Sequence, residues 1–161
     1  MAKPDAVQAL SDWMVETALL ASDYEPMFAE FCERLSGMGL PVIRISVSMT
    51  TLHPMMEAYS LLWTKQDGRA EIQGFAHGAR DQEDWAQSPL KALIDSDKSY
   101  IHHDLTGPGS WSDFPLLREL AEKGITGYLA FVSPFSDERS EFTRQDGMLT
   151  SWSTDHPGGF S

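Results

Sequence analysis

The stretch that decides the fold is GLPVIRISVSMTTLHPMMEAYSLLW, residues 39–63. Its first half alternates between apolar and polar residues, and the side chains of a strand point in turn to two faces, so the pattern predicts a strand. One face carries Ile43, Ile45, Val47 and Met49, and the other carries Val42, Arg44, Ser46 and Ser48. The first face suits a core, whereas an arginine with serines suits a face covered by a ligand or open to water.

Patterns on both sides of this strand predict an α+β domain with a mostly antiparallel central sheet flanked by helices. Asp67-Gly68 is a strong hairpin signal and predicts that the strands before and after it pair with each other. Ser88-Pro89 and Ser112-Asp113 are predicted to begin two short helices. Helices are also expected over residues 5–20 and 26–37, strands over 42–49, 58–64, 70–76, 99–105, 125–132 and 148–154, and a polar connection over 133–146.

Length and composition exclude several classes of protein. A chain of 161 residues has the size of one domain, so residues 1–161 are predicted to form a single one. Its 24 acidic and 12 basic residues disfavour nucleic acid and anionic membranes as partners. Cys32 is the only cysteine, which excludes an internal disulfide. No signal segment opens the chain and no apolar run could cross a bilayer, so a cytoplasmic location is predicted.

Five short motifs are spread over residues 35–160. They are Gly39-Leu40-Pro41 followed by Arg44, Thr51-Leu52-His53-Pro54, Trp63, Gly124-Ile125-Thr126-Gly127-Tyr128-Leu129-Ala130, and the ending SWSTDHPGGF at 151–160. Together they resemble the region that precedes the catalytic domain in many bacterial class III adenylate/guanylate cyclases. The family leads us to expect an acidic residue where Gly127 stands, so this chain departs from the family at that position. The resemblance implies a GAF-like module. The predicted elements also fit a PAS-like architecture, but the opening helix pair favours GAF.

This resemblance implies a function in cAMP signalling. It points to a non-catalytic regulatory or sensor domain that binds a small molecule or a partner and modulates a downstream cyclase domain. The ending Gly158-Gly159-Phe160-Ser161 reads as a strand exit followed by a helix N-cap, which suggests a domain excised from a longer cyclase. Cyclase chemistry requires two metal-binding aspartates on a separate catalytic domain, and no match is found, so this chain is not expected to be an enzyme. A homodimer through the helix at 5–20 is also expected.

The polar face of the central strand is the predicted ligand site. Arg44 is its anchor, because a guanidinium offers a rigid fork of donors to a carboxylate or phosphate, and aromatic rings supply flat walls. The predicted ligand-binding residues are Arg44, His53, Trp63, Tyr128 and Trp152. The alternative is that Arg44 pairs with an acidic side chain and that the aromatic residues are ordinary core.

A second candidate site is built on histidines. His102-His103-Asp104 could hold a transition metal, together with His53 or His77, in a stand-alone metal-dependent enzyme or a haem-binding sensor. A strand would place His102 and Asp104 on one face and His103 on the other, which spoils a compact site. No cofactor is therefore predicted. His53 has a plainer alternative role, as a corner residue bonded to nearby backbone.

Overall fold

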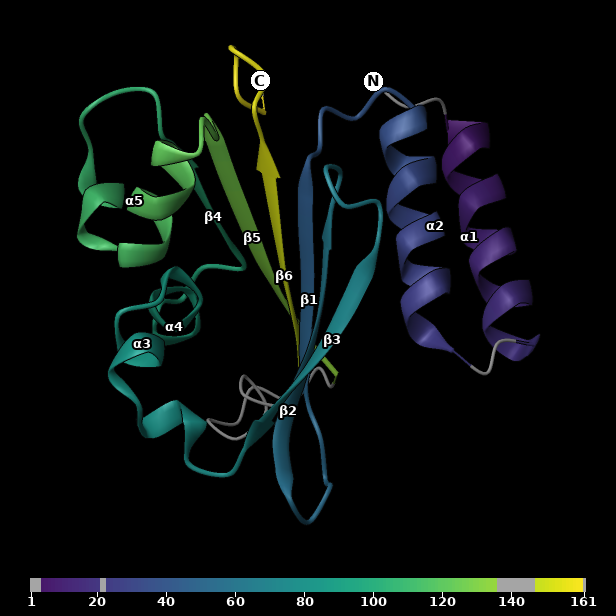
Figure 1. Ribbon diagram of the computed structural model, residues 1–161, viewed down its shortest axis with the longest axis horizontal. Coiled ribbons are helices and arrows are strands. Elements are labelled where there is room, and N and C mark those ends of the chain that lie inside the picture. Colours follow the sequence, from purple (N-terminus) through teal and green to yellow (C-terminus); the bar gives the residue numbers. More distant parts are fainter. Residues whose placement is uncertain (1–3, 21–22, 136–146, 161) are drawn as a thin grey trace.

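The computed structural model describes residues 4–20, 23–135 and 147–160 (Figure 1). Most of the predicted polar connection at 133–146, and Ser161 with its predicted capping role, lie outside these residues. The helices are α1 (Pro4–Leu20), α2 (Tyr24–Gly37), α3 (Glu83–Ala86), α4 (Pro89–Asp95) and α5 (Pro115–Glu122), with 3-10 turns η1 (Ala79–Asp81) and η2 (Ser110–Asp113). The strands are β1 (Arg44–Thr50), β2 (Met56–Thr64), β3 (Ala70–Ala76), β4 (Tyr100–Asp104), β5 (Gly127–Pro134) and β6 (Gly147–Thr154).

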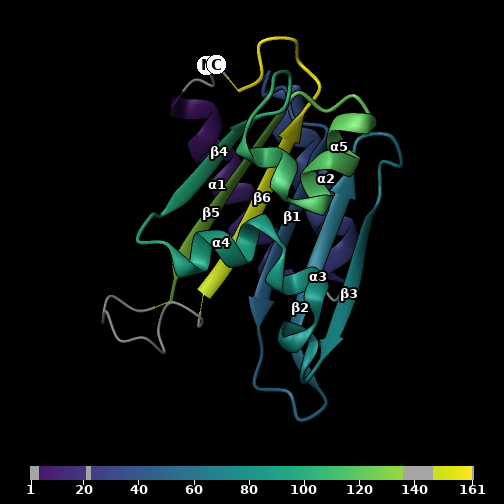
Figure 2. The same cartoon turned by 90° about the vertical axis from the view of Figure 1, so that its left-hand side faces the viewer.

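The six strands form one antiparallel sheet in the order β3-β2-β1-β6-β5-β4. In Figure 1 the sheet is seen nearly edge-on, with α1 and α2 on one side and α3, α4 and α5 on the other. Figure 2 looks onto the second side, where the three shorter helices lie across the strands. The predicted α+β class, with an antiparallel sheet flanked by helices, is confirmed.

Local sequence signals explain where several elements begin. The predicted hairpin turn forms with Gly68 at a φ of 62°, a left-handed conformation that glycine adopts without strain. The Ser88 hydroxyl accepts a hydrogen bond from the Lys91 amide at 3.0 Å and caps α4, as predicted. The prediction for Ser112-Asp113 was wrong, because those residues belong to η2 and α5 begins later, at Pro115. A proline fits the first turn of a helix, where its missing N–H is not needed.

Each face of the sheet has its own apolar core. The core under the helix pair contains Phe28, Cys32, Ile45 and Trp63, and burial there raises the pKa of the Cys32 thiol to about 12. The core on the second face lies between the sheet and α4 and α5, and its fully buried residues are Leu93, Leu117, Tyr128 and Ala130. The sheet thus separates two compartments with different neighbours.

The predicted faces of β1 need one correction at its start. Ile45 and Val47 face the helix pair, and Ser46 and Ser48 face the other way, as the alternation predicts. Val42, however, lies in the core under the helix pair, while Ile43 packs against the core on the second face. The chain bends at Ile43 and the strand begins only at Arg44, so the two-residue period does not extend back to Val42.

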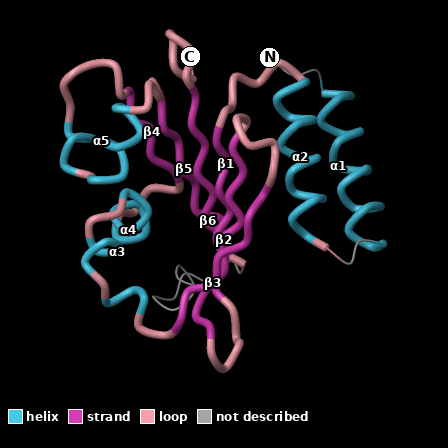
Figure 3. Tube along the Cα trace, viewed as in Figure 1, coloured by secondary structure: helices cyan, strands magenta, loops and turns pink. Residues whose placement is uncertain are grey.

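Within the described residues, no helix combines the length and the apolar character needed to cross a lipid bilayer. The helices are coloured cyan in Figure 3, where strands are magenta and loops are pink.

Candidate functional site

A cavity of about 610 Å³ lies between the sheet and the shorter helices. Small-molecule sites commonly enclose about 300–1,000 Å³. The cavity floor comes from the second face of the sheet and includes Arg44, Ser46, Ser48, Leu62, Tyr128, Leu149 and Ser151. The roof comes from the helices on that side and includes Trp85, Leu90, Ile94 and Leu116. Its size and its position between layers make this cavity the candidate functional site.

Strand register sets the order of side chains on the cavity floor. Ser153 of β6 lies opposite Arg44 on one side and opposite Tyr128 on the other, so these three residues form one row across β1, β6 and β5. Residues that are directly paired point to the same face. Ser46 and Ser151 lie opposite each other in the next row. The arginine and the tyrosine are therefore brought to the same end of the cavity.

Arg44 is a largely buried cation without an ion pair among the described residues. Its Nη1 atom is shielded from solvent and has no hydrogen-bond partner. Burial lowers the pKa of Arg44 from its usual value, and the neighbouring Tyr128 and Glu119 oppose that shift. Glu119 is itself bonded to Lys123 at 2.6 Å on α5. The alternative in which Arg44 pairs with an acidic side chain is thus not what the described part of the chain shows.

Tyr128 is the second polar group at this end. Its side chain is 0% exposed and its hydroxyl oxygen has no hydrogen-bond partner of normal geometry among the described residues. Burial raises the pKa of Tyr128 to about 12, although the nearby Ser151 hydroxyl and the charge of Arg44 offset part of the rise. At neutral pH the phenol is uncharged and can donate its proton in a hydrogen bond.

Serine hydroxyls continue the polar floor along the strands. The Oγ atoms of Ser46 and Ser151 are 2.6 Å apart, and the Ser48 hydroxyl donates to Ser60 Oγ at 2.9 Å. These pairs link β1 to both of its neighbours. The serines predicted on the polar face of β1 therefore do face a cavity.

The structure brings together only two of the five predicted ligand-binding residues. Arg44 and Tyr128 both line the cavity. Trp63 and Trp152 do not, because each lies opposite Ile45 and so faces the helix pair. The prediction that these tryptophans form walls of the same pocket is corrected accordingly.

His53 also lies away from the cavity lining. It occupies the turn between β1 and β2, where its Nδ1 accepts a hydrogen bond from the Met55 amide at 3.1 Å. Its carbonyl oxygen is 3.2 Å from His77 Nε2. This placement matches the alternative of a corner histidine bonded to nearby backbone.

His102 and His103 are adjacent on β4 and point to opposite faces of the sheet, as the strand geometry predicts. His102 lies near the ring of Phe160, with centroids 6.4 Å apart, whereas His103 lies 5.7 Å from the ring of Phe114. Asp104 accepts hydrogen bonds from the amide and hydroxyl of Thr106. Within the part of the chain that the structure describes, no three His, Cys, Asp or Glu residues are grouped so that they could hold a metal ion.

Gly127 is closely packed at the position where the resemblance leads us to expect an acidic side chain. A Cβ atom there would lie 3.1 Å from Thr154 Cγ2 and 3.4 Å from the ring of Phe160. Any larger side chain would require the Thr154 methyl group to shift, and burial of a charge here would cost free energy. Any role that an acidic residue plays at this position cannot be carried over to this chain.

Sequence reasoning missed the roof of the cavity. Leu90 and Ile94 lie on the apolar face of α4, and Leu116 lies on that of α5. The helical spacing of apolar residues does not distinguish a side chain in a solid core from one beside a cavity.

A scan against models of known protein families finds no match to this chain. A comparison with curated proteins also finds no match.

Proposed function

We propose that this chain is a GAF-like regulatory domain that binds a small molecule in the cavity between the sheet and the shorter helices. The observation that carries this proposal is the unpaired, largely buried Arg44 beside a cavity of about 610 Å³. An uncompensated charge in a low-dielectric site is costly, and a bound ligand of opposite charge would remove that cost. The helix pair on one face of the sheet, with the cavity on the other, supports the GAF-like assignment over the PAS-like alternative.

The proposed output is control of an adenylate or guanylate cyclase domain that follows in a longer cytoplasmic protein. The motifs around Arg44, His53 and Trp63 and the motif at 151–160, through their resemblance to the cyclase region, support this part of the proposal. The chain itself is proposed to be non-catalytic. Ligand binding would shift the equilibrium between two conformations of the elements that lead into the cyclase domain. A ligand shifts such an equilibrium only if it binds the two conformations with different affinities.

Ligand binding can be tested by filling the cavity. The Leu149→Trp variant places an indole in the cavity, whereas Met148→Trp alters the neighbouring residue, which is not part of the cavity lining. We expect at least one compound of a metabolite collection to raise the melting temperature of the natural chain by roughly 5–10 °C at saturation. Leu149→Trp should abolish that shift and Met148→Trp should retain it. The proposal fails if native mass spectrometry finds no bound compound, or if the Leu149→Trp variant binds as well as the natural chain.

The proposed assembly is a homodimer through α1. Val15, Leu19 and Leu20 are exposed on this helix, Leu19 to 80% of its surface, while Leu10 is buried against α2. A second copy of α1 would cover this apolar surface. We expect sedimentation velocity to detect a dimer at high micromolar concentration, and Leu19→Glu to convert it to a monomer with an unchanged melting curve. A monomeric natural chain under these conditions would contradict the assembly.

A further inference from the structure

The two ends of the cavity differ in chemistry. Arg44 and Thr50 stand at opposite ends of β1, about 20 Å apart at the usual rise of a strand, and both line the cavity. At the first end lie Arg44 and Tyr128, under Leu116 of α5. The second end, near α3, includes the acidic Asp84. His77 also lines the cavity, and Arg44 is the only permanently charged cation among the described lining residues.

The end with Arg44 has an excess of hydrogen-bond donors. Arg44 Nη1 has no hydrogen-bond partner among the described residues, and the Tyr128 hydroxyl has none of normal geometry there, although the Ser151 hydroxyl lies near it. The Ser46–Ser151 contact uses the proton of one hydroxyl, and the Ser151 hydroxyl also lies near that of Tyr128. Arginine carries donors and no acceptor. A ligand group at this end must consequently supply acceptors, and the charge of Arg44 favours a group that is negative.

The middle of the cavity has an apolar roof and a floor on which apolar side chains lie beside the serine pairs Ser46–Ser151 and Ser48–Ser60. Leu62, Val132 and Leu149 project from the sheet, and Leu90, Ile94 and Leu116 project from the helices opposite. Apolar surfaces of this kind stabilise an apolar ligand by roughly 25 cal/mol for each Å² removed from water. Polar ligand groups that face Leu90, Ile94 and Leu116 would be left unpaired.

Few groups in the cavity could neutralise a second anionic group. Among the described lining residues, Arg44 is the only arginine or lysine. The net charge of the chain, -12, adds a field that opposes polyanions. Nucleoside triphosphates, with several charges and a polar sugar, are consequently poorly matched to this site.

We propose that the ligand has one anionic head, a carboxylate or a phosphate, joined to an apolar body, and that it binds with the head at the Arg44–Tyr128 end and the body between the sheet and α4–α5. This inference rests on the proposed function, because it names the class of ligand for the same cavity. It also states an orientation, which the proposed function does not.

The test uses two fluorescent probes that differ in one charged group. Anilinonaphthalene sulfonate has an anionic head on an apolar body, and N-phenylnaphthylamine has the same body without the head. We expect the natural chain to bind one sulfonate probe per molecule at least tenfold more tightly than the neutral probe. Arg44→Met should weaken the sulfonate probe by roughly 30-fold or more and leave the neutral probe unchanged. ATP is expected not to compete, and competition with naphthoate and naphthyl phosphate identifies the preferred head.

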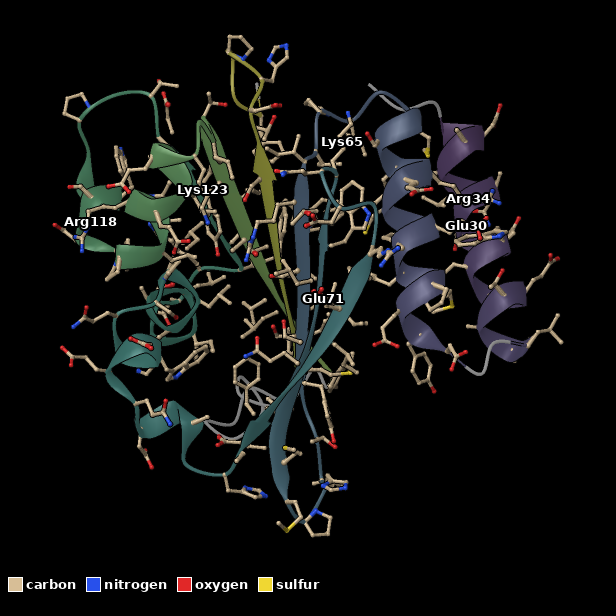
Figure 4. All side chains as sticks on the ribbon, in the orientation of Figure 1. Glu30, Arg34, Lys65, Glu71, Arg118 and Lys123 are labelled. Atoms are coloured by element: carbon tan, nitrogen blue, oxygen red, sulfur yellow. The ribbon has the colours of Figure 1, made fainter. Side chains whose placement is uncertain are left out.

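Three results would overturn the inference, and they are distinguishable from failure of the proposed function. The two probes could bind with equal affinity, with Leu149→Trp blocking both and Arg44→Met changing neither. The cavity would then bind ligands, but the claim that its ligand has an anionic head would be wrong. Competition by ATP would remove the restriction to one anionic group. If neither probe binds in a manner that Leu149→Trp blocks, both the ligand class and the cavity as a binding site are contradicted. Arg34→Met serves as the matched control, because Arg34 is exposed and bonded to Glu30 on α2 (Figure 4).

Discussion

Replacing Arg44 by methionine is expected to stabilise the ligand-free protein. Methionine keeps most of the apolar stem of arginine but removes a buried charge that has no partner among the described residues. We expect the free energy of unfolding to rise by roughly 1–3 kcal/mol. For a domain of this size the melting temperature should rise by roughly 2–10 °C. Calorimetry or chemical denaturation without ligand measures the change directly.

The sign of this change distinguishes a binding residue from a structural one. If Arg44 held an ion pair in the folded protein, its replacement would leave the partner uncompensated and would lower stability. Arg34→Met is the comparison, because Arg34 bonds to Glu30 at 2.6 Å and lies 4.2 Å from the centre of the Trp13 ring. That exposed pair should contribute no more than about 1 kcal/mol. A loss of stability in Arg44→Met larger than the loss in Arg34→Met would refute the assignment of Arg44 to ligand binding.

Alternation along β1 could be predicted because it follows from strand geometry alone. Ile45 and Val47 had to face one way and Ser46 and Ser48 the other, whichever strands lay beside them. The faces of Trp63 and Trp152 depend in addition on how their strands are aligned with β1. A shift of one residue in that alignment moves a side chain to the opposite face. No pattern within either strand reports this alignment, so both tryptophans were assigned to the wrong compartment.

The cavity itself depends on contacts between segments that are distant in the sequence. Leu116 and Leu117 are neighbours on α5, yet Leu117 is fully buried in the core and Leu116 lines the cavity. The difference arises from the way α5 packs over the second face of the sheet, which faces the viewer in Figure 2. Helical periodicity identifies the apolar face of such a helix, and the distance of each residue on that face from the sheet is a tertiary property.

Trp63→Ala is expected to cause the largest loss of stability of any substitution considered. The side chain is 1% exposed and lies in the core under the helix pair with Phe28, Cys32 and Ile45. Truncation of a buried tryptophan typically costs about 3–5 kcal/mol, which is a large part of the total stability of a domain. Thermal and urea denaturation of the variant beside the natural chain measure the loss.

Trp63→Phe keeps the experiment informative if the alanine variant does not fold. Phenylalanine retains much of the buried surface, and it removes an indole N–H that has no hydrogen-bond partner among the described residues. Its cost should therefore be smaller, roughly 1–2 kcal/mol. Because the residue faces away from the cavity, the affinity for the sulfonate probe should stay within about twofold of the natural value.

Leu62→Ala is the matched comparison, since Leu62 precedes Trp63 on β2 and lines the cavity on the opposite face. Leu62 is half-buried, so its truncation should cost less stability than Trp63→Ala, but it removes apolar wall from the cavity and should weaken both fluorescent probes. Two adjacent residues would then show opposite behaviour, one acting on stability and the other on binding. A Trp63→Phe variant that folds normally but loses the probe would mean that the ligand reaches the helix-pair face, and the location of the site between the sheet and the shorter helices would have to be abandoned.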